Sequence, residues 1–200
     1  MQVLKEEVRE KIKIAALREF EKKGYQKASM RSIASGAKLT VGNLYRYFDN
    51  KDSLFRIIIQ PAFQEIYQFI EEFARIKEDS PSKKTKKDNF VKIFEESLIK
   101  IYGQHRAELI ILLNGSKGSQ MENAREQIIY SIAERIKKEA FPKMKKEMTV
   151  VDGFLAEVLA IGFIEGISLV LNKYKDKAKT RKLFTQFTHI YFKNLLDDLI

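Results

Sequence analysis

The feature that most constrains this chain is the helical spacing of its apolar residues, which recur every three or four positions. Val8, Ile12, Ala16 and Phe20 form one such stripe, and no stretch sustains the alternation of apolar and polar residues that marks a strand. Glycine and proline are scarce, at 9 and 3 of 200 residues, whereas an all-β protein needs many more turn residues. The sequence therefore predicts an all-α fold.

We expect about nine helices, because caps and polar breaks divide the periodic pattern into that many segments. The expected helices cover residues 5–23, 30–36, 40–48, 51–73, 90–102, 106–113, 121–140, 151–174 and 177–199. Two polar, lysine-rich stretches, 78–89 and 142–149, are predicted to be loops.

Several classes of chemistry are excluded by residue types that the chain lacks or isolates. With no cysteine, the chain has no disulfide, no thiol nucleophile and no cysteine-ligated zinc. His105 and His189 are the two histidines, and neither has a serine or aspartate at a useful spacing. We therefore predict that the protein is not an enzyme and that it binds no metal and no cofactor.

The sequence also argues against a membrane protein. The longest stretch without Asp, Glu, Lys or Arg is the ten residues Leu183–Phe192, whereas a membrane-spanning helix needs about twenty apolar residues. Residues 1–7 lack the apolar region of a signal peptide. We expect a cytoplasmic protein with no membrane partner.

The positive charge is concentrated near the N-terminus. Residues 1–60 carry 13 basic and 7 acidic side chains, which is +6 of the total net charge of +10. Such a segment suits a polyanion such as nucleic acid, although a lysine-rich solvated surface would give the same balance.

The N-terminal helices have the layout of a helix-turn-helix. Ser29 is placed to cap a short helix, Ala37-Lys38-Leu39 forms a tight turn, and Thr40 is placed to cap a second short helix. In a helix-turn-helix the second short helix enters the major groove of DNA.

The residues of this segment closely resemble the N-terminal signature of the tetracycline-repressor (TetR/AcrR) family. The shared pattern runs from Ser29 through Ile33-Ala34, Leu39-Thr40, Tyr47-Phe48 and Lys51-Asp52 to Leu54, and covers roughly residues 8–58. The resemblance implies a helix-turn-helix DNA-binding domain at residues 1–50 and a helical ligand-binding and dimerisation domain at residues 51–200.

The resemblance also implies a set of DNA contacts. Gly42 lets the helix backbone approach the duplex, Asn43 reads a base edge, and Arg46 bonds a guanine or a phosphate. Tyr45 and Tyr47 place hydroxyls on phosphates, while Lys51 holds a phosphate at a helix N-terminus. The full expected set is Ser29, Arg31, Thr40, Val41, Gly42, Asn43, Tyr45, Arg46, Tyr47 and Lys51.

One position departs from the family pattern. Lys38 stands in the turn where the family usually has glycine, so a positive φ there would cost roughly 1 kcal/mol. Alternatively, the turn shifts by one residue and uses Gly36.

The C-terminal half suggests a dimer and a ligand pocket. Residues 151–174 are apolar around nearly the whole helix, which indicates either a partner on one side or a deep core within one chain. The resemblance favours a dimer through the last two helices, with contacts at Gly162, Gly166, Phe187 and Tyr191. Candidate pocket residues are Phe63, Ile66, Tyr67, Phe94, Leu98, Tyr102, Leu113 and Tyr130, which suggest a small apolar or aromatic effector, although core packing would explain them equally well.

Together these features predict a homodimeric repressor that binds a palindromic double-stranded DNA operator and is released by a ligand. The alternative is an activator or a low-specificity DNA-binding protein without a small-molecule inducer.

Overall fold

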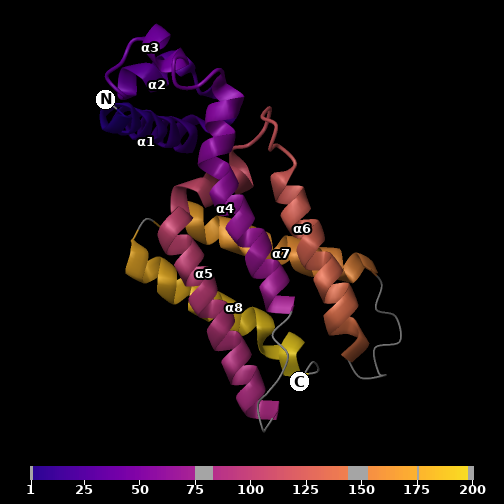
Figure 1. Ribbon diagram of the computed structural model, residues 1–200. Helices are drawn as coiled ribbons and strands as arrows, with labels where there is room; N and C mark the ends of the chain where they lie inside the picture. Colours follow the sequence, from indigo (N-terminus) through magenta and orange to yellow (C-terminus); the bar gives the residue numbers. More distant parts are fainter. Residues whose placement is uncertain (1, 75–82, 144–152, 175, 198–200) are drawn as a thin grey trace. The chain divides into compact units, whose positions relative to one another are not determined.

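The computed structural model describes residues 2–74, 83–143, 153–174 and 176–197, and the regular structure in these ranges is entirely helical (Figure 1). The α-helices are α1 (Gln2–Lys27), α2 (Met30–Gly36), α3 (Val41–Tyr45), α4 (Lys51–Ala74), α5 (Lys83–Asn114), α6 (Ala124–Arg135), α7 (Gly153–Lys173) and α8 (Lys177–Asp197). A π-helical turn, Ile136–Ala140, and a 3₁₀ turn, Phe141–Lys143, follow α6. The predicted all-α fold is confirmed.

Two predicted helix boundaries were wrong. The expected break between residues 102 and 106 is a kink at His105 (φ −128°, ψ 30°) inside α5, so the described residues form eight α-helices and not nine. Residues 83–89, predicted to be loop, belong to the first turns of α5. A polar, lysine-rich sequence can form a helix as well as a loop, so polarity alone was a poor guide. Residues 78–82 and 144–149 of the two predicted loops lie outside the described ranges.

The chain divides into two compact units. The first contains Met1–Gln64 and His105–Arg125, and the second contains Glu65–Gln104 and Glu126–Ile200. The unit that holds the helix-turn-helix is thus larger than the DNA-binding domain that we predicted at residues 1–50. The boundary between the predicted DNA-binding and ligand-binding domains stays a prediction.

An aromatic cluster forms the centre of the first unit. Phe20, Tyr25 and Phe55 are at most 6% exposed, and the Phe55 ring lies 5.0 Å from Phe20 and 4.9 Å from Tyr25 in edge-to-face contacts. Ile33 of α2 and Leu44 of α3 are fully buried, so both short helices contribute side chains to this core. The burial of these large side chains fixes the short helices, which would be unstable alone.

Two glycines bring distant backbone segments together in the first unit. Gly24 has φ +70° and interrupts α1, as the sequence predicted for the helix end. The next residue, Tyr25, donates its backbone N–H to the Gly115 carbonyl at 2.8 Å. Glycine suits this position because its φ is positive, whereas a Cβ on Gly24 would be in ordinary contact with that oxygen at 3.4 Å. Arg106 adds an ion pair with Glu21 at 3.0 Å.

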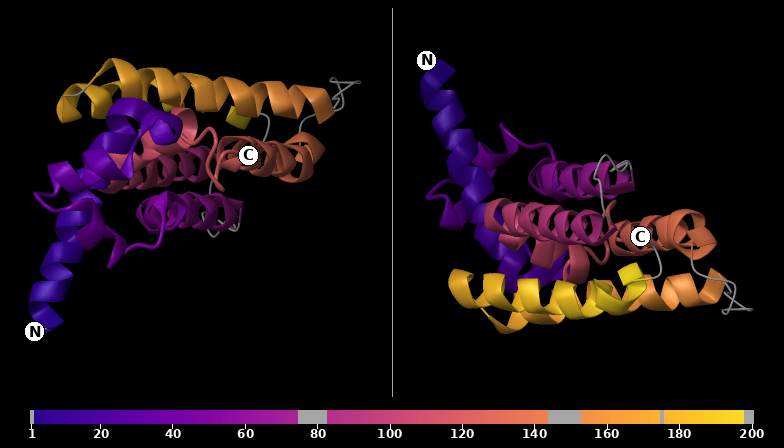
Figure 2. Two further views of the ribbon diagram at one scale, coloured as in Figure 1. Left: turned by 90° about the horizontal axis from the view of Figure 1, so that it is seen from above. Right: turned by 90° about the horizontal axis from the view of Figure 1, so that it is seen from below.

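In the second unit, α7 and α8 lie side by side (Figure 2). Phe187 of α8 stacks on Phe163 of α7, with ring centroids 5.7 Å apart, and Phe187 occupies the space where Gly166 would carry a Cβ. The Tyr191 hydroxyl donates to the Leu159 carbonyl, and burial raises the pKa of Tyr191 to about 12.

This packing gives the predicted dimer residues a role within one chain. We predicted that Gly162, Gly166, Phe187 and Tyr191 meet a second copy of the chain; they contact one another within one chain, and their contact with a second copy stays a prediction. The glycines of α7 accept the aromatic side chains of α8, with a Cβ on Gly162 placed 3.7 Å from the Tyr191 hydroxyl. The sequence showed the small residues but could not show which helix fills the space beside them.

Helix α7 also qualifies the membrane prediction. Within the described ranges it is the one helix long and apolar enough to cross a membrane. Its mean hydropathy is high although Glu157 and Glu165 interrupt the apolar residues. Seven of its residues, including Phe163, Ile167 and Leu171, are buried in the protein, as in the core helix of a globular domain.

Candidate DNA-binding surface

Helix α2 begins with a side-chain cap. The Ser29 hydroxyl accepts a hydrogen bond from the backbone N–H of Ser32 at 3.1 Å, and Ser29 itself has extended backbone angles, as an N-cap requires. Met30, Ile33 and Ala34 face the core, and Arg31 is exposed. The Ser29 hydroxyl also donates to the Ser32 hydroxyl at 2.9 Å. For the predicted DNA contact, Ser29 therefore has one acceptor lone pair left.

The turn after α2 uses Lys38 in the left-handed conformation. Lys38 has φ +57° and, in the described part of the chain, is the one residue other than glycine with positive φ. Its N–H donates to the Ser35 carbonyl at 3.0 Å, and the Leu39 N–H donates to the Ala34 carbonyl at 2.8 Å. These two bonds define a Schellman motif, which usually carries glycine at this position. The alternative that Gly36 takes the positive φ is wrong, since Gly36 is the last residue of α2.

We predict that Lys38→Gly stabilises the protein by up to about 1 kcal/mol, because it removes the left-handed strain at a smaller cost in chain entropy. The denaturant midpoint of the variant, measured beside that of the original chain, tests this. Lys38→Ala is the matched control: it removes the same charge but keeps a Cβ, so its midpoint should not rise. An equal rise in both variants would assign the effect to charge.

Helix α3 is short and presents its other side outward. The Thr40 hydroxyl caps it by accepting from the Asn43 N–H at 3.2 Å, and Leu44 anchors it in the core. A Cβ built on Gly42 meets no atom within 4 Å, so Gly42 borders open space. The absence of a side chain there therefore serves no packing purpose within the described residues.

The side chains of α3 and its neighbours in the DNA-binding set are exposed or half-buried. Arg31 and Arg46 are exposed, Tyr45 is 47% exposed, and Val41, Asn43 and Tyr47 are half-buried. The side chains of Arg31, Tyr45, Arg46 and Tyr47 have no hydrogen bond or ion pair to any described residue. The donors that the sequence predicted for bases and phosphates are therefore available on one small helix and its flanks (Figure 1).

Lys51 is engaged in a way that the sequence did not predict. Its ammonium donates to the carbonyls of Tyr25 at 2.9 Å and Ala28 at 3.1 Å, and it lies 4.2 Å from the centre of the Tyr25 ring. Lys51 therefore ties the first turn of α4 to the end of α1, and at most one of its three N–H groups is left for a phosphate. The family motif showed the position of this lysine but not the carbonyls that it meets.

Asp52 extends this connection to a third segment. Its carboxylate accepts the backbone N–H of Gln120 at 3.2 Å and a hydrogen bond from the Tyr25 hydroxyl. Burial, followed by the effect of Asp52, raises the pKa of Tyr25 to about 12, so the hydroxyl stays protonated at neutral pH. Residues 105–125 are thus attached to α1 and α4 within the first unit. The sequence did not predict this attachment.

The eight predicted pocket residues do not all belong to one unit. Phe63 and Leu113 lie in the first unit, and the other six lie in the second. Phe94 and Tyr102 are buried, whereas Tyr130 is 67% exposed. Tyr130 is thus an exposed ring on α6, and the pocket formed by these residues stays a prediction.

Residues 14–58 match the sequence profile described as bacterial regulatory proteins, tetR family. The matched segment contains α2, the Lys38 turn, α3 and the start of α4, which together form the surface around Gly42. The chain therefore carries the DNA-binding domain of the tetR family and is a DNA-binding transcriptional regulator. Members of that family are regulators and not enzymes.

Full-length comparisons agree with this assignment. The fatty acid metabolism regulator protein of Bacillus subtilis (strain 168) is 25% identical over 158 residues, which are 78% of this chain and 71% of that protein. A TetR-family transcriptional regulator from Bordetella parapertussis 12822 has a TM-score of 0.65 at 20% identity, with 92% and 93% of the two chains covered. The fatty acid degradation regulator FadR from Bacillus halodurans has a TM-score of 0.51 at 17% identity, covering 90% and 93%. The two structural likenesses show a shared fold.

Proposed function

We propose that this tetR-family regulator is a cytoplasmic, homodimeric repressor that binds a palindromic operator through α3 and is released by a small apolar effector. The outer side of α3 supports the proposed DNA contacts. There Gly42 borders open space, and the side chains of Arg46 and Tyr45 form no hydrogen bond or ion pair with a described residue. Arginine pairs with guanine edges or phosphates, and a tyrosine hydroxyl bonds phosphates. Asn43 and Val41 complete the proposed readout, with Arg31, Tyr47 and the remaining N–H of Lys51 as supporting contacts.

An exposed apolar stripe on α7 supports the homodimer. Phe154 and Leu169 are each 68% exposed, and Val158 and Ile161 are more than 40% exposed. These residues follow one another at helical spacing, in line with Glu165, on the side of α7 that α8 does not cover. A palindromic operator presents two half-sites about 34 Å apart, so one chain with one recognition helix reads half of it. A second copy covering this stripe would supply the other half.

The interior of the second unit supports an apolar effector with a polar group. Tyr102 is 3% exposed, its ring lies edge-on to Phe184 at 5.2 Å, and its hydroxyl has no hydrogen-bond partner among the described residues. Burying such a hydroxyl without a partner costs about 1–3 kcal/mol, so an effector that supplies an acceptor there would gain that amount. The related Bacillus subtilis protein is named for fatty acid metabolism, which favours a fatty acid or its ester as the effector class.

Release would follow if the effector binds one arrangement of the dimer better than another. Helices α4 and α5 each contribute residues to both compact units. A ligand that displaces either helix in the second unit would therefore move residues of the first unit, including the Lys51 and Asp52 connections. The separation of the two recognition helices in the dimer would change as a result.

The test is selection of bound duplexes from a random DNA pool at physiological salt, followed by titration with hexadecanoic acid and its methyl ester. The proposal expects one enriched palindrome, loss of base preference at one position in Asn43→Ala or Arg46→Ala, and release by at least one of the two compounds. Enrichment without release would favour the activator or inducer-free alternative. Uniform binding of all duplexes, with affinity set by salt alone, would contradict specific recognition.

We predict that Tyr102→Phe leaves the free protein as stable as before or more stable by up to about 1 kcal/mol, because it removes an unsatisfied buried hydroxyl. The same change should raise the concentration of hexadecanoate or methyl ester that releases DNA by roughly tenfold, as expected for one lost hydrogen bond. Thermal unfolding without ligand and DNA release with ligand are the two measurements. A loss of stability of 1 kcal/mol or more would mean that the hydroxyl has a partner such as a buried water.

A further inference from the structure

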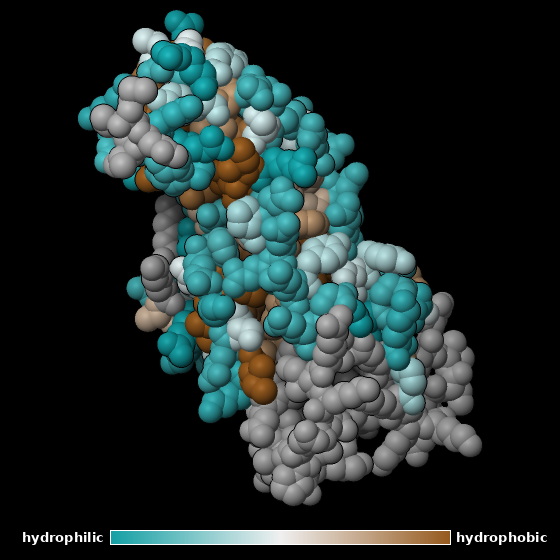
Figure 3. Space-filling view, viewed as in Figure 1, coloured by the Kyte–Doolittle hydropathy of each residue, from teal (hydrophilic) through white to brown (hydrophobic). Residues whose placement is uncertain are grey.

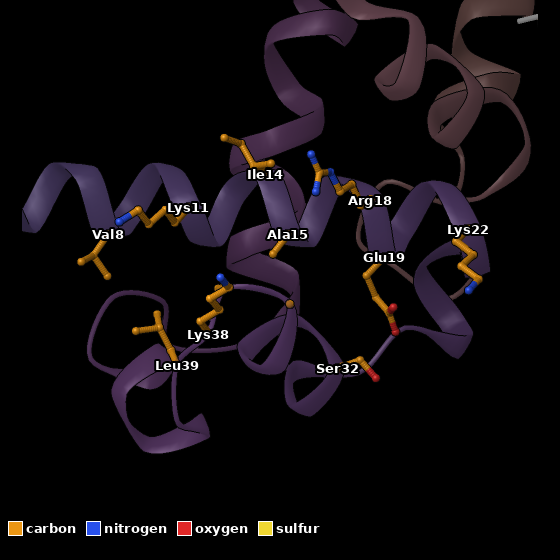
Figure 4. A pocket seen from close by; sticks show the side chains of 12 residues that line it. Val8, Lys11, Ile14, Ala15, Arg18, Glu19, Lys22, Ser32, Lys38 and Leu39 are labelled. Carbon is orange, nitrogen blue, oxygen red and sulfur yellow. The ribbon is translucent and has the colours of Figure 1, made fainter.

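A groove in the first unit lies apart from the proposed DNA contacts. It has a volume of about 610 Å³ and runs between α1 and the segment formed by the end of α2 and the turn. Figure 4 shows Lys38 and Leu39 reaching from the turn toward α1, where Val8 and Ala15 point toward them. None of the ten residues proposed for DNA contact lines this groove.

The groove combines an apolar strip with cations that have no partner. Val8, Ile14, Ala15 and Leu39 supply the apolar surface, and Ile14 is 51% exposed. The face of the molecule shown in Figure 3 is largely hydrophilic, with scattered hydrophobic areas. Val8 and Leu39 are half-buried and Ala15 is buried, so the strip is a partly exposed apolar surface with a charged border that a partner can cover.

The charges around the strip are unusual because they are unpaired. Lys11, Arg18, Lys22 and Lys38 border the groove, and none of their side chains forms an ion pair or hydrogen bond with a described residue. Neighbouring lysines of the same helix do have partners, since Lys13 pairs with Glu10 and Lys23 pairs with Glu19. Glu19, the one acidic residue of the lining, is thereby already neutralised.

We propose that this groove binds an acidic, amphipathic peptide segment of a partner protein. The stretch of α1 from Val8 to Lys22 is about 21 Å long at 1.5 Å per residue, which matches a partner helix of about 15 residues. The apolar side of such a helix covers the strip, and its carboxylates meet the four cations. This is the helix-in-groove mode of recognition, with charge complementarity fixing orientation.

Two other occupants fit the groove less well. A DNA backbone would satisfy the cations but would leave Val8, Ile14 and Leu39 against a polar duplex. A single-carboxylate amphiphile such as dodecanoate would cover the strip but would pair with one or two of four cations spread along α1. An extended, multiply charged peptide uses both the strip and the whole set of cations.

The test measures anisotropy of a fluorescent peptide of about 15 residues, with leucines at helical spacing and Asp or Glu elsewhere, against the full-length protein. We expect saturable binding that Lys11→Glu and Lys22→Glu together weaken about tenfold, since each reversal replaces a weak attraction by a repulsion. Ile14→Ser should weaken binding by about threefold or more, because a half-exposed isoleucine loses its new burial. Lys13→Glu, the matched control off the groove, should change binding less than twofold.

The same titration can overturn the proposal in several ways. A peptide with serine in place of every leucine that binds equally well would reduce the effect to charge, and dodecanoate binding without peptide binding would replace the peptide by a small amphiphile. Absence of peptide binding would contradict the proposal. If peptide binding is unaffected by the groove variants and those variants lose affinity for random duplex DNA, the groove is part of the DNA-binding surface. Circular dichroism of each variant confirms that the helices are intact.

Discussion

Gly42→Leu is expected to abolish tight DNA binding while leaving the protein folded and at least as stable. Glycine within a helix costs about 1 kcal/mol relative to a good helix former, and a Cβ on Gly42 meets no atom within 4 Å, so the new side chain has room in the free protein. The same side chain would stand between α3 and the duplex backbone. Overpacking of this kind costs about 1–3 kcal/mol, up to roughly a hundredfold in affinity. The two measurements are the denaturant midpoint and operator affinity.

The opposite signs of the two effects make this prediction specific. A variant that merely damaged the fold would lose stability and affinity together. Ser35→Leu is a suitable control, because Ser35 is an exposed residue of α2 outside the proposed contact set. Unchanged operator affinity in Gly42→Leu would remove α3 as the recognition helix, whatever the behaviour of the control.

The local structure of the DNA-binding segment could be predicted well from the sequence. Ser29 and Thr40 were placed as N-caps and both accept the expected backbone N–H, because capping depends on residues three positions apart. The positive φ of Gly24 and the tight turn at Lys38 are equally local. The choice between Lys38 and Gly36 for the left-handed position was open in the sequence, because it depends on where α2 ends by a single residue.

The sequence could not show contacts between residues far apart along the chain. Lys51 was predicted to hold a phosphate, which stays a prediction for its remaining N–H group, because its place in the motif is the same whether its ammonium points outward or inward. The carbonyls that it meets are 23 and 26 residues away and follow the kink at Gly24 inside α1. Gly166 likewise identified a close approach, but the identity of the approaching group, Phe187, depends on how α8 packs back along α7.

The proposed dimer should be disrupted by a single charged substitution, Ile161→Glu, in the middle of the exposed stripe of α7. Ile161 is 43% exposed in one chain, so a glutamate there is tolerated by the monomer. In a two-fold dimer each substitution occurs twice in one interface, and burying two unpaired carboxylates costs several kcal/mol. We expect the dissociation constant of the dimer to rise by about a hundredfold or more. Sedimentation at micromolar concentration measures this.

Tyr130→Glu and Gly166→Leu show why the position of the substitution matters. Tyr130 is 67% exposed on α6, so Tyr130→Glu adds the same charge off the stripe and should leave the dimer intact. Gly166→Leu would force a side chain into the Phe187 ring of its own chain, so it would unfold the α7–α8 pair and could not report on dimerisation. Operator affinity should fall with the dimer in Ile161→Glu, although Ile161 is not a DNA contact, because an isolated chain reads one half-site. A monomeric Ile161→Glu that still binds the full palindrome tightly would contradict the dimeric repressor.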